Sequence, residues 1–291
     1  MFKGSCVALV TPFKNGEVDE EKLRELVEFH IKNGTDIILA AGCTGEAATL
    51  SMEEQKKVIR LVVETVQHRI PVFAGAGSNN TKEALELTRY AKEVRAEAAL
   101  LITPYYNKPT PAGLVAHYTR IAQEVDIPII LYNVPSRTGI SMLPETVIEL
   151  SKVPNIVGIK EASGNLDNVN AIIQGTQGFD VFSGDDALAF PIMCLGGVGI
   201  VSVVNNIIPQ DMAAMVDAFF AGDLEQARKL HHKMYPLIKA MFYETNPMPV
   251  KACLEMMGLI SGELRLPLVS VTDATRKKLA IALKDYGLLK K

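Results

Sequence analysis

Eight short apolar segments recur along most of this chain, and their spacing is the feature that most limits its fold. They begin 31, 34, 27, 30, 28, 25 and 17 residues apart. The segments are 5–13, 36–44, 70–78, 97–106, 127–135, 155–162, 180–186 and 197–205. Unbroken apolar runs without polar alternation are typical of parallel strands that are covered on both faces. The pattern therefore predicts repeated βα units.

The stretches between most of these segments have helical periodicity and carry the signals that begin and end helices. Four of them are 19–34, 51–66, 81–94 and 111–125. Asp19 is a favourable N-cap, and Ser51 with Glu54 has the spacing of a capping box. Eight βα units predict a closed (β/α)8 barrel, the TIM-barrel fold. The alternative is an open doubly wound sheet, which would need about six strands and a glycine-rich first turn that this sequence lacks.

Helical patterns continue beyond the eighth apolar segment to the end of the chain. They are predicted at 208–221, 223–243, 247–257 and 270–288. We therefore expect a catalytic barrel domain at 1–222 and a C-terminal helical extension at 223–291. The extension is too short for an independent catalytic domain, so it is expected to pack on the barrel or on a partner.

Composition narrows the classes of function. Apolar residues make up 48% and charged residues 22% of the 291, with a net charge of −3, which argues against a nucleic-acid partner. No apolar run approaches the ~18 residues of a membrane helix, and the N-terminal run stops at Pro12, as in a first strand and unlike a signal peptide. Four scattered cysteines without a C-x-x-C pair indicate reduced thiols and a cytoplasmic protein. The five histidines show no metal-ligand spacing, so no metal is expected.

One of the apolar segments contains a lysine, and barrel enzymes place their active sites at the carboxyl ends of such strands. Lys160 stands in 155–162 on the same strand face as Gly158, which would leave room for a small molecule beside the amine. Removal from water favours the neutral amine that attack on a carbonyl requires. The alternative is a structural ion pair of Lys160 with Glu161 or Asp185.

Tyrosine and arginine side chains follow other strands. Tyr132 ends a buried strand, where a phenol suits the relay of protons, and Arg137 follows in a loop, where its planar fork can bind a carboxylate. Each also has an ordinary structural interpretation, as a core tyrosine and a solvated arginine. Tyr106 follows the fourth strand, and Gly184 opens the sequence Gly-Asp-Asp, whose plainer interpretation is a helix cap.

The turn at 40–51 combines small and polar residues. Gly42 and Gly45 surround Cys43 and Thr44, so backbone N–H groups can approach an anion, and the positive end of the following helix would add to its binding. Cys43 has no histidine near it in sequence, which favours a packed thiol over a reactive nucleophile.

The motifs TPYYNKPT, YNVPSRTG and GIKEASGN, followed by ETNPMPVKACLEMMG, resemble the dihydrodipicolinate synthase branch of the pyruvate-dependent class I aldolase family. That family also contains N-acetylneuraminate lyase, which does not keep YNVPSRTG in this form. The resemblance covers nearly the whole chain. It implies a lyase of lysine and diaminopimelate biosynthesis that condenses pyruvate with L-aspartate-4-semialdehyde. It implies no cofactor other than a covalent pyruvate Schiff base.

The same resemblance implies catalytic roles. Lys160 would form the Schiff base with pyruvate, and Tyr132 would relay protons. Thr44 would bind the pyruvate carboxylate and pass protons with Tyr132. Tyr106 would reach across a dimer interface into the neighbouring active site, within a homotetramer built from two dimers.

Three further residues are implied in substrate binding, and one position departs from the family. Arg137 would hold the carboxylate of aspartate-4-semialdehyde, while Gly184 and Val201 would line the pyruvate pocket through their backbones. Cys43 stands where the family normally has a threonine that links two tyrosines of the relay. A thiol is a weaker hydrogen-bond donor than a hydroxyl, so a slower or rearranged relay is expected.

A second departure concerns regulation, and other functions stay open. Ala47, Met52 and Gln55 stand where lysine-inhibited members carry polar or histidine side chains, which predicts weak or no inhibition by lysine. One rival is an aldolase or lyase that acts on another 2-oxo acid or sugar acid. The others are a pyridoxal-phosphate barrel enzyme with Lys160 bound to the cofactor, and a non-catalytic binding protein.

Overall fold

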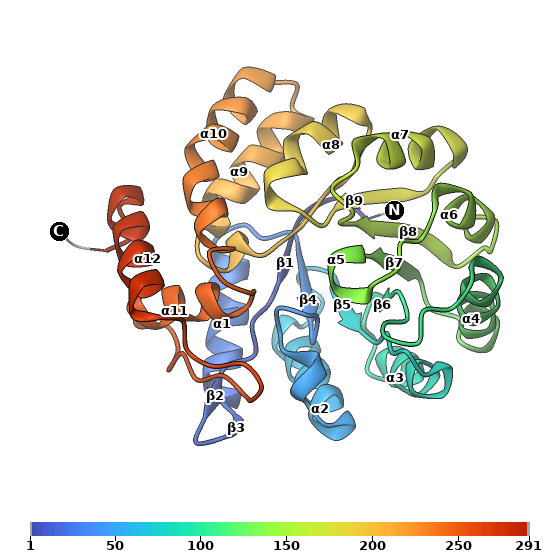
Figure 1. Cartoon of the computed structure of the whole chain (residues 1–291), viewed down its shortest axis with the longest axis horizontal. Coiled ribbons are helices and arrows are strands. Elements are labelled where there is room, and N and C mark those ends of the chain that lie inside the picture. Colours follow the sequence, from blue (N-terminus) through green and yellow to red (C-terminus); the bar gives the residue numbers. More distant parts are fainter. Residues whose placement is uncertain (1, 290–291) are drawn as a thin grey trace. The chain divides into compact units, whose positions relative to one another are not determined.

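Eight strands close into a barrel in the computed structural model, which describes residues 2–289 (Figure 1). They are β1 (Gly4–Ala8), β4 (Ile37–Ala40), β5 (Val72–Gly75), β6 (Ala98–Ile102), β7 (Ile129–Asn133), β8 (Ile156–Glu161), β9 (Asp180–Ser183) and β10 (Gly199–Ser202). Their order around the barrel is β1, β10, β9, β8, β7, β6, β5, β4. The predicted TIM barrel is thereby confirmed, and the alternative of an open doubly wound sheet is wrong.

By its internal contacts the chain divides into two compact units. The first comprises Pro71–Val201 with the first residues of the chain. Its helices are α3 (Thr81–Glu93), α4 (Pro111–Glu124), α5 (Pro135–Thr138), α6 (Pro144–Leu150), α7 (Leu166–Gly175) and α8 (Ala189–Leu195). The longer helices lie outside strands β5 to β9 in Figure 1. Inside, Phe73 of β5 meets Phe182 of β9 edge to face, with ring centroids 6.1 Å apart, so aromatic packing fills this part of the core.

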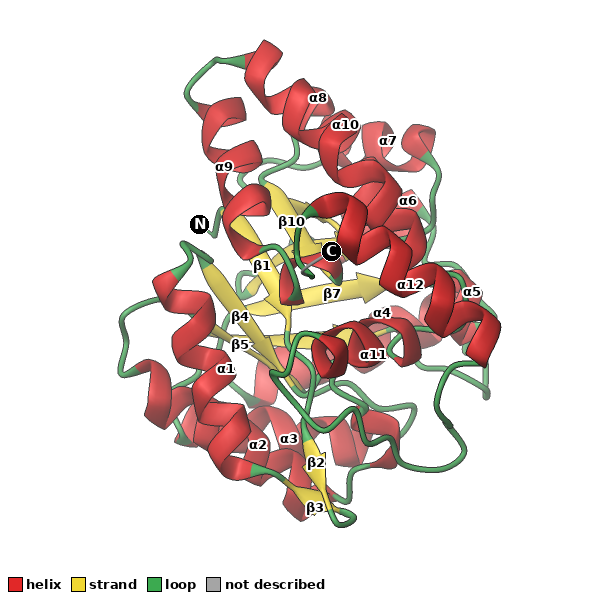
Figure 2. Ribbon diagram, turned by 90° about the vertical axis from the view of Figure 1, so that its left-hand side faces the viewer, coloured by secondary structure: helices red, strands yellow, loops and turns green. Residues whose placement is uncertain are grey.

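The second unit comprises Ser5–Ile70 and the chain from Ser202 onward. Its helices are α1 (Glu20–Lys32), α2 (Met52–Val66), α9 (Pro209–Phe220), α10 (Leu224–Ala240), α11 (Met248–Met256) and α12 (Asp273–Tyr286). Helix α1 packs on α2, α10 packs on α9 and α12, and α11 packs on α12 (Figure 2). A short antiparallel hairpin, β2 (Phe13–Lys14) and β3 (Glu17–Val18), follows β1 and was not predicted, because each of its strands is only two residues long.

Helix boundaries agree with the local signals in the sequence. The Asp19 side chain accepts a hydrogen bond from the Lys22 N–H at 3.1 Å and begins α1. Ser51 and Glu54 form the predicted capping box at the start of α2. These caps satisfy backbone N–H groups that a helix leaves unpaired at its start, which explains why the predicted and observed starts coincide.

The helices predicted after the barrel are also present, as α10, α11 and α12. The division into a barrel domain at 1–222 and an extension at 223–291 stays a prediction. The outer ends of these two ranges, residue 1 and residues 290–291, lie outside the described residues. Within the described part of the chain, no helix is long and apolar enough to span a membrane.

Candidate active site

Lys160 lies in the middle of a row of side chains that neighbouring strands bring into register. Its Cα pairs with Tyr132 on β7 and with Phe182 on β9. Only 5% of Lys160 is exposed, and Tyr132 is equally buried. The Nζ atom lies 4.2 Å from the centroid of the Tyr132 ring. The negative face of that ring stabilises a positive charge on Nζ, whether ammonium or protonated imine, by up to about 2 kcal/mol in a desolvated site.

The two carboxylates considered as structural partners of Lys160 are engaged elsewhere. Glu161 accepts hydrogen bonds from the Asn133 amide at 2.9 Å and from the Ser163 backbone N–H at 2.6 Å, one on each oxygen. Asp185 accepts from the Ala187 N–H at 2.8 Å and caps a short 3-10 helix, as the plainer interpretation of Gly-Asp-Asp predicted. The contacts of both carboxylates thus serve the turns that follow β8 and β9.

The room beside the lysine comes from a different glycine than the sequence suggested. A Cβ on Gly158 would lie 2.5 Å from the Asp180 carbonyl oxygen, so Gly158 is needed for the close approach of β9 and leaves no space for a ligand. A Cβ on Gly184 would lie 3.1 Å from both Cγ and Cε of Lys160 and 2.7 Å from the Cβ of Ala162. Gly184, directly after β9, therefore keeps the stem of Lys160 uncrowded.

Two buried polar residues that the sequence analysis did not single out hold the Tyr132 segment. Thr103 is fully buried, and both its hydroxyl and its backbone N–H donate to the Tyr132 carbonyl at 2.9 Å. Asn133 accepts from the Met142 N–H at 2.9 Å and donates to Glu161. Thr103 directly follows β6 and Asn133 is the last residue of β7, and a polar residue at a barrel strand end is the signal that could have identified them.

Arg137 and Tyr106 are exposed in segments that follow two strands of the same unit. Arg137 belongs to α5, the single helical turn after β7, and its side chain is exposed. Tyr106 is 90% exposed and has a positive φ of 69°. Asn107 fixes the tip of its loop, because its backbone N–H donates to the Tyr105 carbonyl and its side chain donates to the Asn79 carbonyl. The loop thus presents an aromatic ring to the outside on a defined backbone.

In the second unit, the turn after β4 carries Cys43 and Thr44. Cys43 is half-buried and unpaired with another cysteine, while Thr44 is only 3% exposed. The Asn246 side-chain amide donates a hydrogen bond to Thr44 Oγ1 at 3.0 Å. Asn246 was missed, although the Asn-Pro pair at 246–247 is a recognisable turn signal.

A buried ion pair fixes the end of this turn. Glu46 has a left-handed backbone, φ 56°, and its carboxylate lies 2.6 Å from Lys251 Nζ, with both side chains 0% exposed. Lys251 also donates to the Thr11 carbonyl at 3.0 Å, and its Nζ lies 4.3 Å from the Phe13 ring centroid. Burial lowers the pKa of the Lys251 ammonium, and the Glu46 carboxylate opposes that shift. The pair holds Glu46 in a conformation that a non-glycine residue rarely adopts.

The expected help from a helix terminus at this turn is not supported by the structure. A 3-10 helix at Ala47–Thr49 separates the turn from α2, which begins at Met52. The Ser51 side chain accepts from the Glu54 N–H, which caps the start of α2. The polar groups of the turn are instead held by side chains from other segments: Asn246 donates to the Thr44 hydroxyl, and Thr11 donates to the Gly45 carbonyl.

Val201 lies in β10 and is buried. Among residues 2–289, no group of three His, Cys, Asp or Glu side chains is placed to hold a metal ion.

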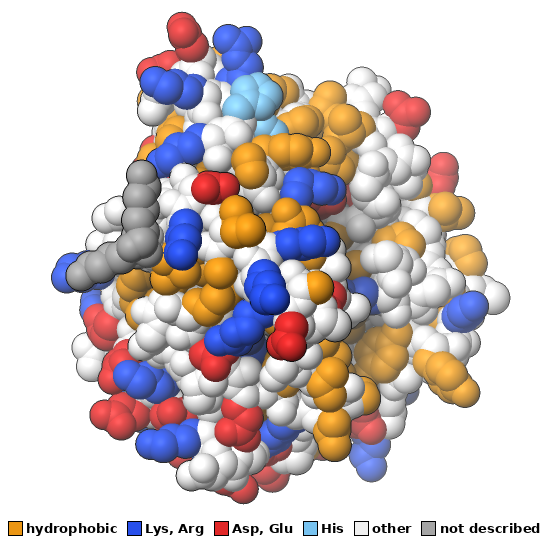
Figure 3. All heavy atoms as spheres, turned by 60° about the vertical axis from the view of Figure 1, so that its left-hand side comes forward, with side chains coloured by type: hydrophobic (Ala, Val, Ile, Leu, Met, Phe, Trp, Pro, Cys, Tyr) orange, Lys and Arg blue, Asp and Glu red, His pale blue; other side chains and the backbone are white. Residues whose placement is uncertain are grey.

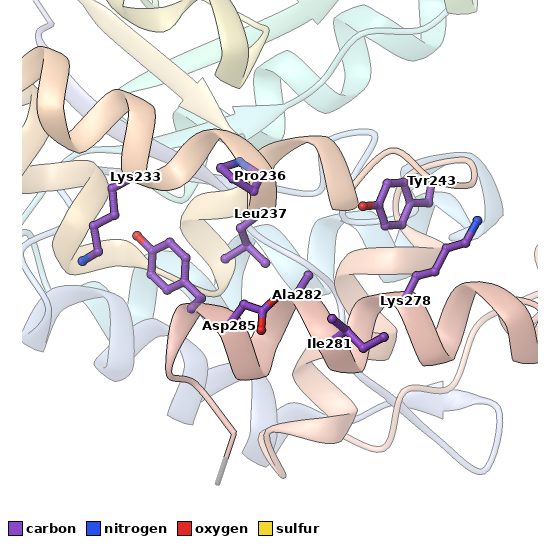
Figure 4. Close-up of a pocket in the computed structure, with 9 residues that line it drawn as sticks. Lys233, Pro236, Leu237, Tyr243, Lys278, Ile281, Ala282 and Asp285 are labelled. Carbon is purple, nitrogen blue, oxygen red and sulfur yellow. The ribbon is translucent and has the colours of Figure 1, made fainter. Parts of the chain in front are cut away.

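A surface groove lies in the second unit. Apolar and lysine side chains gather on this face in Figure 3, and the groove of about 370 Å³ runs between α10 and α12 (Figure 4). Its labelled lining residues are Lys233, Pro236, Leu237, Tyr243, Lys278, Ile281, Ala282 and Asp285. The Lys233 amine is held by Asp211 at 2.6 Å and therefore does not offer a reactive group.

The chain is similar to known proteins over nearly its whole length. A model of the dihydrodipicolinate synthetase family matches residues 1–286. The 4-hydroxy-tetrahydrodipicolinate synthase of Syntrophus aciditrophicus (strain SB) is 54% identical over 290 residues, which cover 99% of this chain and 100% of that protein. The protein of the same name from Geotalea uraniireducens (strain Rf4) is 56% identical over 291 residues, with the same coverage. The chloride inhibited dihydrodipicolinate synthase from Acinetobacter baumannii, crystallised in complex with pyruvate, has a TM-score of 0.97 at 48% identity, over 99% of this chain and 100% of that one.

Proposed function

This chain belongs to the dihydrodipicolinate synthetase family, and we propose that it makes 4-hydroxy-tetrahydrodipicolinate from pyruvate and aspartate-4-semialdehyde on Lys160. The observation that carries the assignment to Lys160 is its amine, buried at a barrel strand and lying 4.2 Å from the Tyr132 ring centroid. The reaction is that of a lyase in the diaminopimelate route to lysine. It uses a covalent Schiff base and no separate cofactor.

The first half of the reaction activates pyruvate. The Lys160 amine adds to the keto carbon, and loss of water leaves a protonated imine between that carbon and Nζ. The imine withdraws electrons, so a methyl proton departs to a base and an enamine forms. The face of the Tyr132 ring lies where the positive charge of the imine develops, and the Tyr132 hydroxyl relays the protons.

The second half joins the two substrates and releases the product. The enamine carbon attacks the aldehyde carbon of aspartate-4-semialdehyde, and the aldehyde oxygen takes up a proton to become a hydroxyl. The amine of the bound adduct then attacks the imine carbon. The bond from that carbon to Nζ breaks, which frees Lys160 and the hydroxylated ring.

The remaining residues bind substrate in this proposal. Arg137, exposed on α5 directly after β7, binds the carboxylate of the aldehyde through its planar fork. The Thr44 hydroxyl binds the carboxylate of pyruvate and passes protons with Tyr132. Gly184 and Val201 offer backbone groups to pyruvate. Cys43 takes the place of the relay threonine, and its thiol is a weaker hydrogen-bond donor than that hydroxyl.

Comparing aldehydes tests the identity of the second substrate. We expect condensation with pyruvate, followed in a coupled assay that consumes the cyclic product, to be fastest with aspartate-4-semialdehyde. Aldehydes that lack its carboxylate should react at least ~100-fold more slowly, because Arg137 would then be left without a partner. Equal rates with sugar aldehydes would instead identify an aldolase for another substrate.

Tyr106 leads us to propose that the working form contains a tight dimer, and that two such dimers form a tetramer. An exposed aromatic ring on a loop fixed by Asn107 and Asn79 is typical of a contact with a second subunit. The ring then reaches the neighbouring subunit's site and completes its proton relay.

Mixing two inactive variants tests this shared site. Lys160→Met and Tyr106→Phe chains carrying different affinity tags can be co-expressed and the mixed dimers purified through both tags. One site of each mixed dimer then combines an intact Lys160 with the partner's intact Tyr106, so activity should return well above that of either parent. Mixed dimers as inactive as the parents would show that Tyr106 acts within its own subunit.

A cytoplasmic location stays a prediction. None of the four cysteines, Cys6, Cys43, Cys194 and Cys253, forms a disulfide, which supports a reducing compartment.

A further inference from the structure

The environment of Thr44 determines which way its hydroxyl can point. Thr44 is 3% exposed and Asn246 is 5% exposed, and the amide of Asn246 reaches Thr44 Oγ1 at 3.0 Å. An amide NH2 group can only donate, whereas a hydroxyl has a single hydrogen to donate and lone pairs to accept. Once Thr44 accepts from Asn246, its own hydrogen is directed elsewhere.

The backbone around Thr44 leaves little freedom beyond that hydroxyl. The Thr11 hydroxyl donates to the Gly45 carbonyl at 2.7 Å, and a Cβ on Gly45 would lie 2.9 Å from the Leu9 carbonyl oxygen. Glu46 is held by the buried ion pair with Lys251. Since the turn is fixed on both sides, rotation about the Thr44 side chain is the degree of freedom that Asn246 controls.

We propose that Asn246 is a positioning residue that makes the Thr44 hydroxyl a hydrogen-bond donor toward the carboxylate of bound pyruvate. A carboxylate only accepts, so a hydroxyl that donated to its neighbour would offer it nothing. The proposal rests on the proposed function and deepens it, because it gives the segment that precedes α11 a share in substrate binding. Asn246 touches Thr44 and acts through it.

Replacing Asn246 by leucine, which has nearly the same shape, removes the donor. We expect kcat/KM for pyruvate to fall about 10- to 100-fold, mostly through KM, because Thr44 loses its preferred orientation. The KM for aspartate-4-semialdehyde should change little. Should the leucine variant fold poorly, Asn246→Asp serves the same purpose, since an ionised carboxylate cannot donate to Thr44 and the same loss is expected.

A double-mutant cycle separates positioning from a general structural effect. In a Thr44→Val background there is no hydroxyl to orient, so adding Asn246→Leu should lower kcat/KM for pyruvate by less than about 3-fold. If the two losses multiply instead, Asn246 acts independently of Thr44 and the proposal is wrong. An unchanged pyruvate KM in the single variant would also overturn it.

Asn206→Leu is the matched control. Asn206 is as buried as Asn246 in the same unit, but its amide donates to the Ala8 and Val203 carbonyls and its oxygen accepts from the Val10 N–H. Both variants should melt at lower temperature, and only Asn246→Leu should raise the pyruvate KM.

Borohydride trapping of pyruvate on Lys160 distinguishes a failure of the proposed function from a failure of the proposed role of Asn246. An unlabelled wild-type Lys160 would overturn the proposed function and this role together, whereas a labelled wild type with an unchanged KM in the variant refutes the role of Asn246 alone.

Discussion

Replacing Lys160 by methionine is expected to lower the rate of condensation by at least ~10⁴-fold, because the covalent intermediate can no longer form. Methionine fills a similar volume, and an apolar side chain costs less to bury than an ammonium, so the melting temperature should stay the same or rise. The measurement is kcat in the coupled assay together with mass spectrometry after treatment with pyruvate and borohydride. The wild-type protein should carry one reduced pyruvyl group, on the peptide that contains Lys160.

The second buried lysine of the chain provides the control for this experiment. Lys251 is fully buried, and Lys160 is nearly so. The Lys251 amine, however, is held by the Glu46 carboxylate and the Thr11 carbonyl. A Lys251→Met protein that folds should still be labelled on Lys160. Label on any other lysine of the wild-type protein, or turnover retained by Lys160→Met, would contradict the assignment.

Replacing Lys251 by methionine is expected to destabilise the protein by ~3–5 kcal/mol, because the Glu46 carboxylate would be left buried without its cation. For a chain of this size that corresponds to a fall in the melting temperature of roughly 5–8 °C. The activity of the folded fraction should fall less than in Lys160→Met, since the pair supports the turn and does not react. Thermal melting followed by circular dichroism measures the effect.

Two further variants show whether the loss comes from the unpaired charge. Adding Glu46→Gln to Lys251→Met removes that charge and should restore part of the stability. Lys233→Met breaks an ion pair with Asp211 at the surface, where the Lys233 side chain is 52% exposed. The substitution should lower the free energy of unfolding by at most ~1 kcal/mol. If the Lys251→Met and Lys233→Met proteins had the same melting temperature, the buried pair would contribute no more to stability than a surface pair.

Local signals explain how much of the fold and the site could be predicted. Helix starts at Asp19 and Ser51 follow from side chains that cap their own backbone, so only a few neighbouring residues matter. Strand parity places Lys160 on the same face of its strand as Gly158, but only the register of β7 and β8 places Tyr132 beside Lys160. By contrast, parity alone suggested Gly158 as the space for a ligand, and the backbone of β9 fills that space.

The sequence by itself determined the order of the strands and helices, the barrel that they close, and the buried lysine in one of its strands. Periodicity, caps and strand parity are properties of short segments, which is why they can be read without a structure. Only the tertiary structure decided which polar groups support the turn at Cys43 and Thr44. Asn246 is 202 residues from Thr44 and Lys251 is 205 residues from Glu46 along the chain. Such polar side chains are stable in the interior only because folding brings their hydrogen-bond and ion-pair partners to them. Because those partners are distant in sequence, no local pattern predicts the contacts.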